Sequence, residues 1–199
     1  PRPRKAPRGA IGEALAASVD EAFGLRVHAI DAAGEPVLLG RLALPGARDV
    51  VGQGSYAYAS ARLTGGDSVQ LASVDLSDPT APVVAATLDG PALDLLGADA
   101  DRLYAVEIGA TSKLTVLRPL GTGIVMAAGS VSLPGYAEAV AASDGLAVVL
   151  SVQRALEPPT YGFTVIDAAD PMRPRAAGGG ALAGFLPQRA ALEGDLLVI

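Results

Sequence analysis

The sequence predicts an all-β protein made of repeated small antiparallel sheets, and three observations lead to this prediction. The turn sequence VDLSDPTAP at residues 74–82 returns as IDAADPMRP at residues 166–174. Each turn is followed by a run of apolar and small residues and then by a glycine-containing corner. Beyond each corner, two short apolar runs flank Gly or Asp, as in a tight turn between antiparallel strands. A repeat of about 40–50 residues with four short strands is typical of a β-propeller blade.

The first ten residues carry the only basic cluster of a chain whose net charge is −6. Arg2, Arg4, Lys5 and Arg8 lie among prolines, which resist packing into a helix or a sheet. We therefore predict that residues 1–10 form a solvated linker or loop rather than an arm for nucleic acid or membrane. The rest of the chain is acidic, and no apolar run reaches the roughly 18 residues that span a bilayer. Neither nucleic acid nor membrane insertion is expected.

Residues 11–22 form a partial copy of the repeat, because GEALAAS at residues 12–18 parallels GSYAYAS at residues 54–60. The apolar spacing of this stretch also fits a helix, through Ile11, Ala14, Leu15, Ser18, Val19 and Ala22. The parallel with the later copy favours strands.

Four blade-length copies follow, at residues 23–67, 68–113, 114–161 and 162–199. The first begins with a shortened turn, IDAAGEP from Ile30, and the third has a degenerate turn in LTVLRPLGTGIV from Leu114. Equivalent positions lie 44 residues apart from Ile30 to Val74, and 92 residues apart from Val74 to Ile166. We predict propeller repeats over residues 11–199 as a fragment of a larger ring, and terminal strands that complete a shared blade are the alternative.

The repeated turn has a structural explanation. Its aspartates can accept hydrogen bonds from backbone N–H groups of the turn, and its first proline fixes φ near −65°. Its second proline opens the next strand, where a missing N–H donor is tolerated. The residues of this structural motif are Asp31, Asp75, Asp78, Pro79, Pro82, Asp167, Asp170, Pro171 and Pro174.

The runs VDLSDPTAPVV and VIDAADPMRPR and the closing LLVI resemble the LVIVD-repeat β-propellers. The copy at Leu114 departs from this pattern, with Arg118 and Pro119 in place of the aspartate and its follower. The resemblance implies a bacterial or archaeal protein that is extracellular, attached to the cell surface or periplasmic. It supplies no catalytic residue.

Few side chains are candidates for chemistry. The absence of cysteine excludes disulfides, thiol nucleophiles and Cys-ligated metals. His28 is the only histidine, no Gly-x-Ser-x-Gly elbow occurs, and His28 is expected to be a strand residue beside a neighbouring sheet. Asp94, Asp99 and Asp101 could offer oxygen ligands to calcium, but a hairpin tip explains them equally well.

Other motifs are better explained by structure. The glycines at residues 178–180 and at Gly121 do not open a helix after a strand, so they lack the geometry of a phosphate cradle. Tyr56, Tyr58 and Tyr104 lie in strand-like runs and are expected in the core.

Two functions follow from these observations. The first is a non-catalytic scaffold or interaction module of an exported or surface-attached protein, with an unknown protein or surface ligand as partner and no cofactor. The alternative is a propeller hydrolase or lyase with a site in the central channel, with or without the assistance of calcium. An enzyme would be distinguished by a cluster of carboxylates, His28 or basic residues with shifted pKa values.

Overall fold

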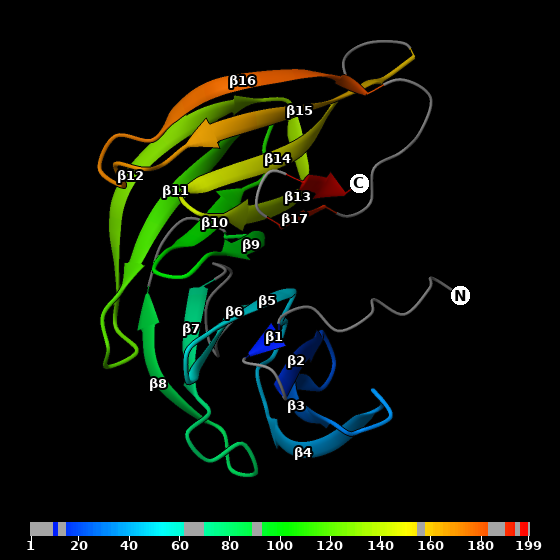
Figure 1. Cartoon of the computed structure of the whole chain (residues 1–199), viewed down its shortest axis with the longest axis vertical. Helices are drawn as coiled ribbons and strands as arrows, with labels where there is room; N and C mark the ends of the chain where they lie inside the picture. Colours follow the sequence, from blue (N-terminus) through cyan, green and yellow to red (C-terminus); the bar gives the residue numbers. More distant parts are fainter. Residues whose placement is uncertain are drawn as a thin grey trace. The chain divides into compact units, whose positions relative to one another are not determined.

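The computed structural model describes residues 10–11, 15–61, 70–88, 93–154, 158–182, 190–193 and 196–198. These residues form strands β1 to β18 and no helix, which confirms the predicted all-β class (Figure 1). Within them, no helix is long and apolar enough to cross a membrane. Ala10 begins the first strand, whereas the remainder of the predicted linker, residues 1–9, lies outside the described part of the chain.

The strands form four antiparallel sheets of four strands each, with neighbours in chain order. Sheet 1 consists of β1 (Ala10–Ile11), β2 (Leu15–Asp20), β3 (Gly24–Ile30) and β4 (Pro36–Leu42). Sheet 2 consists of β5 (Asp49–Gln53), β6 (Tyr56–Ala61), β7 (Gln70–Asp75) and β8 (Val83–Leu88). Sheet 3 consists of β9 (Leu95–Ala98), β10 (Leu103–Glu107), β11 (Thr111–Pro119) and β12 (Val125–Pro134). Sheet 4 consists of β13 (Tyr136–Ser143), β14 (Leu146–Gln153), β15 (Thr160–Asp167) and β16 (Arg175–Leu182).

A further hairpin, β17 (Ala191–Glu193) and β18 (Leu196–Val198), forms a two-stranded sheet. The predicted copies are offset from the sheets. Residues 23–67, for example, contain the last two strands of sheet 1 and the first two strands of sheet 2. The partial copy at residues 11–22 contains strand rather than helix, because β2 covers most of its described part.

The last strand of each four-stranded sheet, which we call the outer strand, is β4, β8, β12 or β16. Each outer strand contains a β-bulge where it pairs with the strand before it. The register shifts fall between Val27 and His28, Ser73 and Val74, Thr115 and Leu117, and Val165 and Ile166. A bulge adds one residue to its strand and changes which side chains share a face beyond it. The bulge in sheet 1 is important for the candidate site.

The chain divides into two compact units. The first unit, residues 1–91 and 121–124, contains sheets 1 and 2. Their facing sides share a core of small aliphatic residues, among them Ala17, Leu25 and Val27 from sheet 1 and Ala72 and Val74 from sheet 2. All five side chains are fully buried, so each sheet covers an apolar face of the other.

The second unit, residues 92–120 and 125–199, contains sheets 3 and 4 and the β17–β18 hairpin. Tyr104 and Leu114 of sheet 3 pack with Val149 and Ile166 of sheet 4. The other face of sheet 4 contributes Leu150 to a smaller cluster, against which Leu192 of β17 packs. Successive sheets therefore cover one another in both units, as predicted for propeller blades. Of the three tyrosines expected in the core, Tyr58 and Tyr104 are buried, whereas Tyr56 is only partly buried.

Candidate functional site

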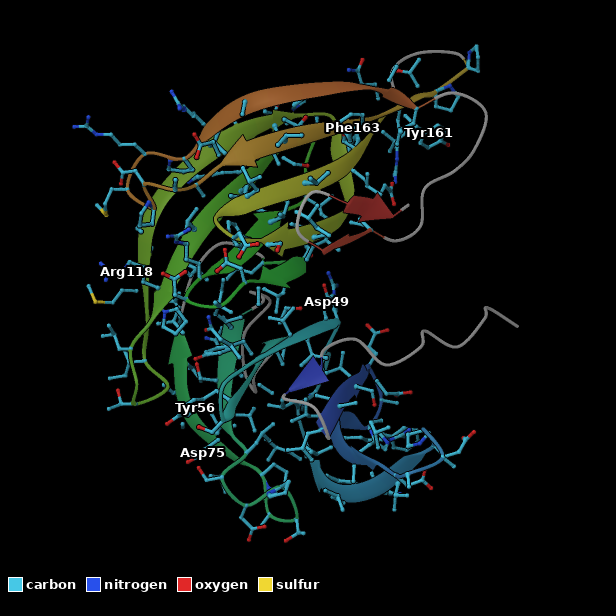
Figure 2. The ribbon with its side chains drawn as sticks, in the orientation of Figure 1. Asp49, Tyr56, Asp75, Arg118, Tyr161 and Phe163 are labelled. Atoms are coloured by element: carbon cyan, nitrogen blue, oxygen red, sulfur yellow. The ribbon has the colours of Figure 1, made fainter. Side chains whose placement is uncertain are left out.

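The aspartates of the first full turn bind their own backbone. The carboxylate of Asp75 accepts hydrogen bonds from the Ser77 backbone N at 2.8 Å and from the Ser77 hydroxyl at 2.7 Å. Asp78 accepts from the Thr80 hydroxyl at 2.6 Å and from its backbone N at 3.0 Å. The hydroxyl donors, followed by the backbone donors, hold the pKa of both carboxyls below its usual value. Figure 2 shows Asp75 at the turn of sheet 2.

The second full turn repeats this arrangement with different donors. Asp167 accepts from the Ala169 backbone N at 3.0 Å and from the Arg175 guanidinium at 2.9 Å. These two donors, in that order, lower the pKa of Asp167. Asp170 accepts from the Met172 backbone N at 3.0 Å. The carboxylates of this turn are therefore occupied by local contacts.

The shortened turn uses one aspartate for two donors. Asp31 Oδ1 accepts from the backbone N of Ala33 at 2.9 Å and of Glu35 at 2.8 Å. Gly34 in this turn has a φ of 82°, a left-handed conformation that favours glycine.

The closing prolines of the two full turns pack against the outer strand of the preceding sheet. A Cβ added to Gly40 of β4 would lie 2.9 Å from Cδ of Pro82, and one added to Gly129 of β12 would lie 2.5 Å from Cδ of Pro174. Both prolines are buried, and each directly precedes a strand. Pro79 and Pro171 lie within the two turns, three residues before the closing prolines.

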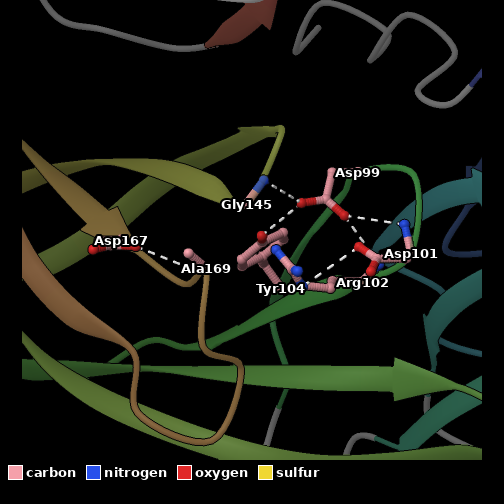
Figure 3. Close-up of polar contacts among 7 residues, drawn as sticks. All are labelled: Asp99, Asp101, Arg102, Tyr104, Gly145, Asp167 and Ala169. Carbon is pink, nitrogen blue, oxygen red and sulfur yellow. Dashed lines mark hydrogen bonds and ion pairs between the residues drawn. The ribbon is translucent and has the colours of Figure 1, made fainter.

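Asp99, one of the three candidate calcium ligands, has a carboxylate that connects two hairpin tips (Figure 3). Its Oδ2 accepts from the Tyr104 hydroxyl at 2.7 Å and from the Gly145 backbone N at 3.0 Å. Its Oδ1 accepts from the backbone N of Asp101 at 3.2 Å and of Arg102 at 3.0 Å. Burial, followed by the bond to Asp99, raises the pKa of Tyr104. This carboxylate joins sheet 3 to sheet 4.

The two other candidate calcium ligands have separate partners. Asp94 Oδ2 accepts from the Ile108 backbone N at 3.1 Å, and the exposed carboxylate of Asp101 forms an ion pair at 3.4 Å with Arg102, whose side chain is mostly buried. Within the described residues, no group of three or more His, Asp or Glu side chains could hold a metal ion.

A different set of residues gathers on one face of sheet 1. Leu25 and Val27 of β3 point into the core of the first unit, so the alternate residues Arg26 and His28 lie on the opposite face. His28 is paired with Leu38 of β4, and residues that face each other across two antiparallel strands share a face. His28 therefore lies on the face directed away from sheet 2, not beside that sheet.

The bulge at residue 39 completes this set. Before the bulge His28 is paired with Leu38, and beyond it Arg26 is paired with Arg41. Without the extra residue, Arg26 would lie opposite Gly40, and Arg41 would point toward the core of the first unit. The bulge therefore brings Arg41 next to Arg26. We call this surface the β3–β4 face and define it by six residues: Phe23, Arg26, His28, Ile30, Leu38 and Arg41.

The β3–β4 face combines exposed apolar side chains with basic ones. Phe23 is 65% exposed, Leu38 40% and Ile30 37%. The guanidinium carbon of Arg26 lies 5.2 Å from the centre of the Phe23 ring, within the range of a cation–π contact. Burial, followed by the charge of Arg26, lowers the pKa of His28.

The corresponding face of sheet 2 is apolar. Val74 and Ala72 have the same positions relative to their bulge as His28 and Arg26, and both are fully buried against sheet 1. Sheet 1 thus has two basic residues where sheet 2 has its packing surface. The strand sequence LRVHAI showed the alternation of Arg26 and His28, but it could not show that the bulge adds Arg41.

The second unit contains a small recess near the ends of β14 and β15. Its volume is about 200 Å³, and its lining includes Ser151, Gln153, Thr160, Tyr161 and Phe163. Figure 2 shows Tyr161 and Phe163 on this part of sheet 4. Sites for small molecules usually enclose about 300–1,000 Å³. The recess is thus a weaker candidate than the β3–β4 face.

No protein-family model and no curated protein matches the chain. Among solved structures, a chain of a nidogen/laminin complex matches with a TM-score of 0.53 at 16% identity, over 83% of this chain and 57% of the other. A chain of the S. cerevisiae assembly of Dbp5 bound to Nup159, Gle1, IP6 and ADP matches with a TM-score of 0.52 at 12% identity, over 88% of this chain and 43% of the other. The chain thus spans about half of the solved chains, and the matches show a fold of β-propeller type.

Proposed function

We propose that the chain is a non-catalytic β-propeller interaction module that binds a protein partner through the β3–β4 face. The observation that carries this proposal is the composition of that face. Three large apolar side chains are exposed beside two arginines on one side of a rigid sheet. Aromatic residues and arginine are enriched at protein interfaces and supply most of their binding energy.

Two further observations support an interaction module over an enzyme. The carboxylates of Asp75, Asp78, Asp99, Asp167 and Asp170 accept hydrogen bonds from turn and hairpin donors, so they already have structural roles. The two solved chains of similar fold come from assemblies of several proteins, as their descriptions state. The proposal has two further parts, namely that the chain is a member of the LVIVD-repeat propellers and that it is exported from the cell. Only the repeated turn supports these two parts.

A capture experiment tests the proposal. Three forms of the chain are immobilised: the unchanged chain, the double variant Phe23→Ser and Leu38→Ser, and the control double variant Val83→Ser and Val84→Ser. The control residues are exposed to a similar degree, at 56% and 41%, and lie on β8. We expect the same partner to be captured by the unchanged chain and the control, and to be lost with the pair on the β3–β4 face. Equal capture by all three would contradict the proposal.

A further inference from the structure

We infer that the partner presents a segment with carboxylate and apolar side chains to the β3–β4 face, an inference that rests on the proposed function. The first step is charge. Arg26 and Arg41 are directly opposite each other on neighbouring strands, an arrangement that is unfavourable for like charges. In the described part of the chain, no carboxylate forms an ion pair with either guanidinium. An anion between the two strands would remove this repulsion.

A carboxylate on the neighbouring strand β2, that of Asp20, already has hydrogen-bond partners. Asp20 ends β2 on the same side of the sheet as Ser18, which is paired with Arg26. Its Oδ1 accepts from the backbone N of Ala22 at 2.9 Å and of Phe23 at 3.2 Å. Asp20 therefore stabilises the β2–β3 turn, and within the described residues it forms no ion pair with Arg26 or Arg41.

Unused hydrogen-bonding capacity is the second step. Nε of Arg26 and Nδ1 of His28 are both buried and have no hydrogen-bond partner. A buried polar group without a partner is costly, and the cost is recovered when a binding partner provides one. Nε of Arg26 is a donor in every charge state, so it needs an acceptor, and a carboxylate accepts at two oxygens; Nδ1 of His28 donates to the same group when it carries a proton.

The third step is the apolar surround. Phe23, Ile30 and Leu38 are exposed around the basic side chains, so a purely charged ligand would leave them in contact with water. A peptide segment that alternates acidic and apolar residues covers both kinds of surface. A nucleic acid fits less well, because a chain with a net charge of −6 repels a long polyanion.

Two short peptides provide the probe. Fluorescently labelled Glu-Leu-Glu-Phe-Glu and its neutral counterpart Gln-Leu-Gln-Phe-Gln are titrated with the chain, and anisotropy reports binding. We expect the acidic peptide to bind roughly tenfold more tightly than the neutral one, since charge-assisted hydrogen bonds distinguish them. Added salt should reduce this preference, because the charges lie at the surface.

Matched variants locate the binding. The pair Arg26→Gln and Arg41→Gln should weaken the acidic peptide about tenfold, whereas the control pair Arg118→Gln and Arg173→Gln should change it less than about threefold. Both pairs change the net charge equally, and both control residues are exposed; Figure 2 shows Arg118 projecting away from the ribbon. Circular dichroism at rising temperature verifies that all variants fold.

Several results would overturn the inference. Equal binding of the two peptides, an equal loss from both pairs of variants, or no binding of either peptide would each contradict it. A 12-nucleotide oligothymidylate is compared in the same assay. If it binds more tightly than the acidic peptide and loses this binding with Arg26→Gln and Arg41→Gln, the ligand of the face is a nucleic acid and the inference is wrong. The capture experiment is independent, because it removes apolar side chains and uses a natural partner. If the capture experiment succeeds and the peptides do not bind, the proposed function is supported and this inference is wrong.

Discussion

Gly129 in the outer strand of sheet 3 lies directly against the Asp-Pro turn of sheet 4. A Cβ at this position would be 2.5 Å from Cδ of Pro174 and 2.6 Å from the carbonyl oxygen of Met172. The oxygen belongs to the backbone of a turn that Asp170 holds by a hydrogen bond to the Met172 backbone N. This internal bond stiffens the turn, so Gly129→Ala should push β12 and the turn apart locally.

The expected cost can be isolated with a matched glycine. Gly178 of β16 has the same position relative to its bulge, but an added Cβ would have nothing within 4 Å. Both substitutions remove the flexibility of glycine from the unfolded chain, which stabilises by about 0.4–1 kcal/mol. Only Gly129→Ala adds steric overlap with the turn, and this overlap lowers stability by about 1–3 kcal/mol. The difference between the two variants therefore measures the contact with the turn.

Thermal unfolding followed by circular dichroism tests this prediction. For a chain of this length, 1 kcal/mol corresponds to a shift in Tm of about 2–4 °C. Gly129→Ala should unfold several degrees below Gly178→Ala, and Gly178→Ala should unfold at or slightly above the temperature of the unchanged chain. Equal melting temperatures for the two variants would refute the packing of the turn against β12.

Three further outcomes are expected. Asp99→Ala should destabilise the fold by about 3 kcal/mol because several donors lose their acceptor, whereas Asp101→Ala should change it by less than about 0.5 kcal/mol in the same melting assay. The pKa of His28, measured by NMR titration, should lie below 6.5 and rise in Arg26→Gln, because the nearby charge no longer opposes protonation. Chemical unfolding at a series of pH values should show a contribution of three carboxyls to stability that is present above about pH 4 and is lost on further acidification. The carboxyls responsible, whose pKa values are lowered by folding, are Asp75, Asp78 and Asp167.

The repeated turn could be recognised from the sequence because its contacts are local. Asp75 binds Ser77, and Asp167 binds Ala169, so each pair is separated by two positions. Interactions of this range depend on residue type and on the conformation that proline imposes, and both are visible in the sequence. The fold class followed, because a repeated turn between apolar runs fixes where strands begin and end.

The contacts between sheets could not be predicted in the same way. Asp99 and Gly145 are 46 positions apart, and their hydrogen bond depends on how two hairpin tips approach each other. Ser112 is similar, since its buried hydroxyl accepts from the Ala137 backbone N at 2.9 Å and donates to the Gly135 carbonyl oxygen at 2.8 Å. Neither residue belongs to the repeated motif, so periodicity gave no signal for either contact.

Hydrogen-bonding state separates the polar residues of this chain into two groups. Asp99 and Ser112 lie between sheets, and their polar atoms have partners, as a stable interface requires. Arg26 and His28 lie on a sheet face and each has a buried nitrogen without a partner. The second arrangement costs folding free energy, since it leaves buried polar nitrogens without partners and places two arginines side by side. An acceptor from outside the chain would offset this cost, which is the physical reason why we propose binding at the β3–β4 face.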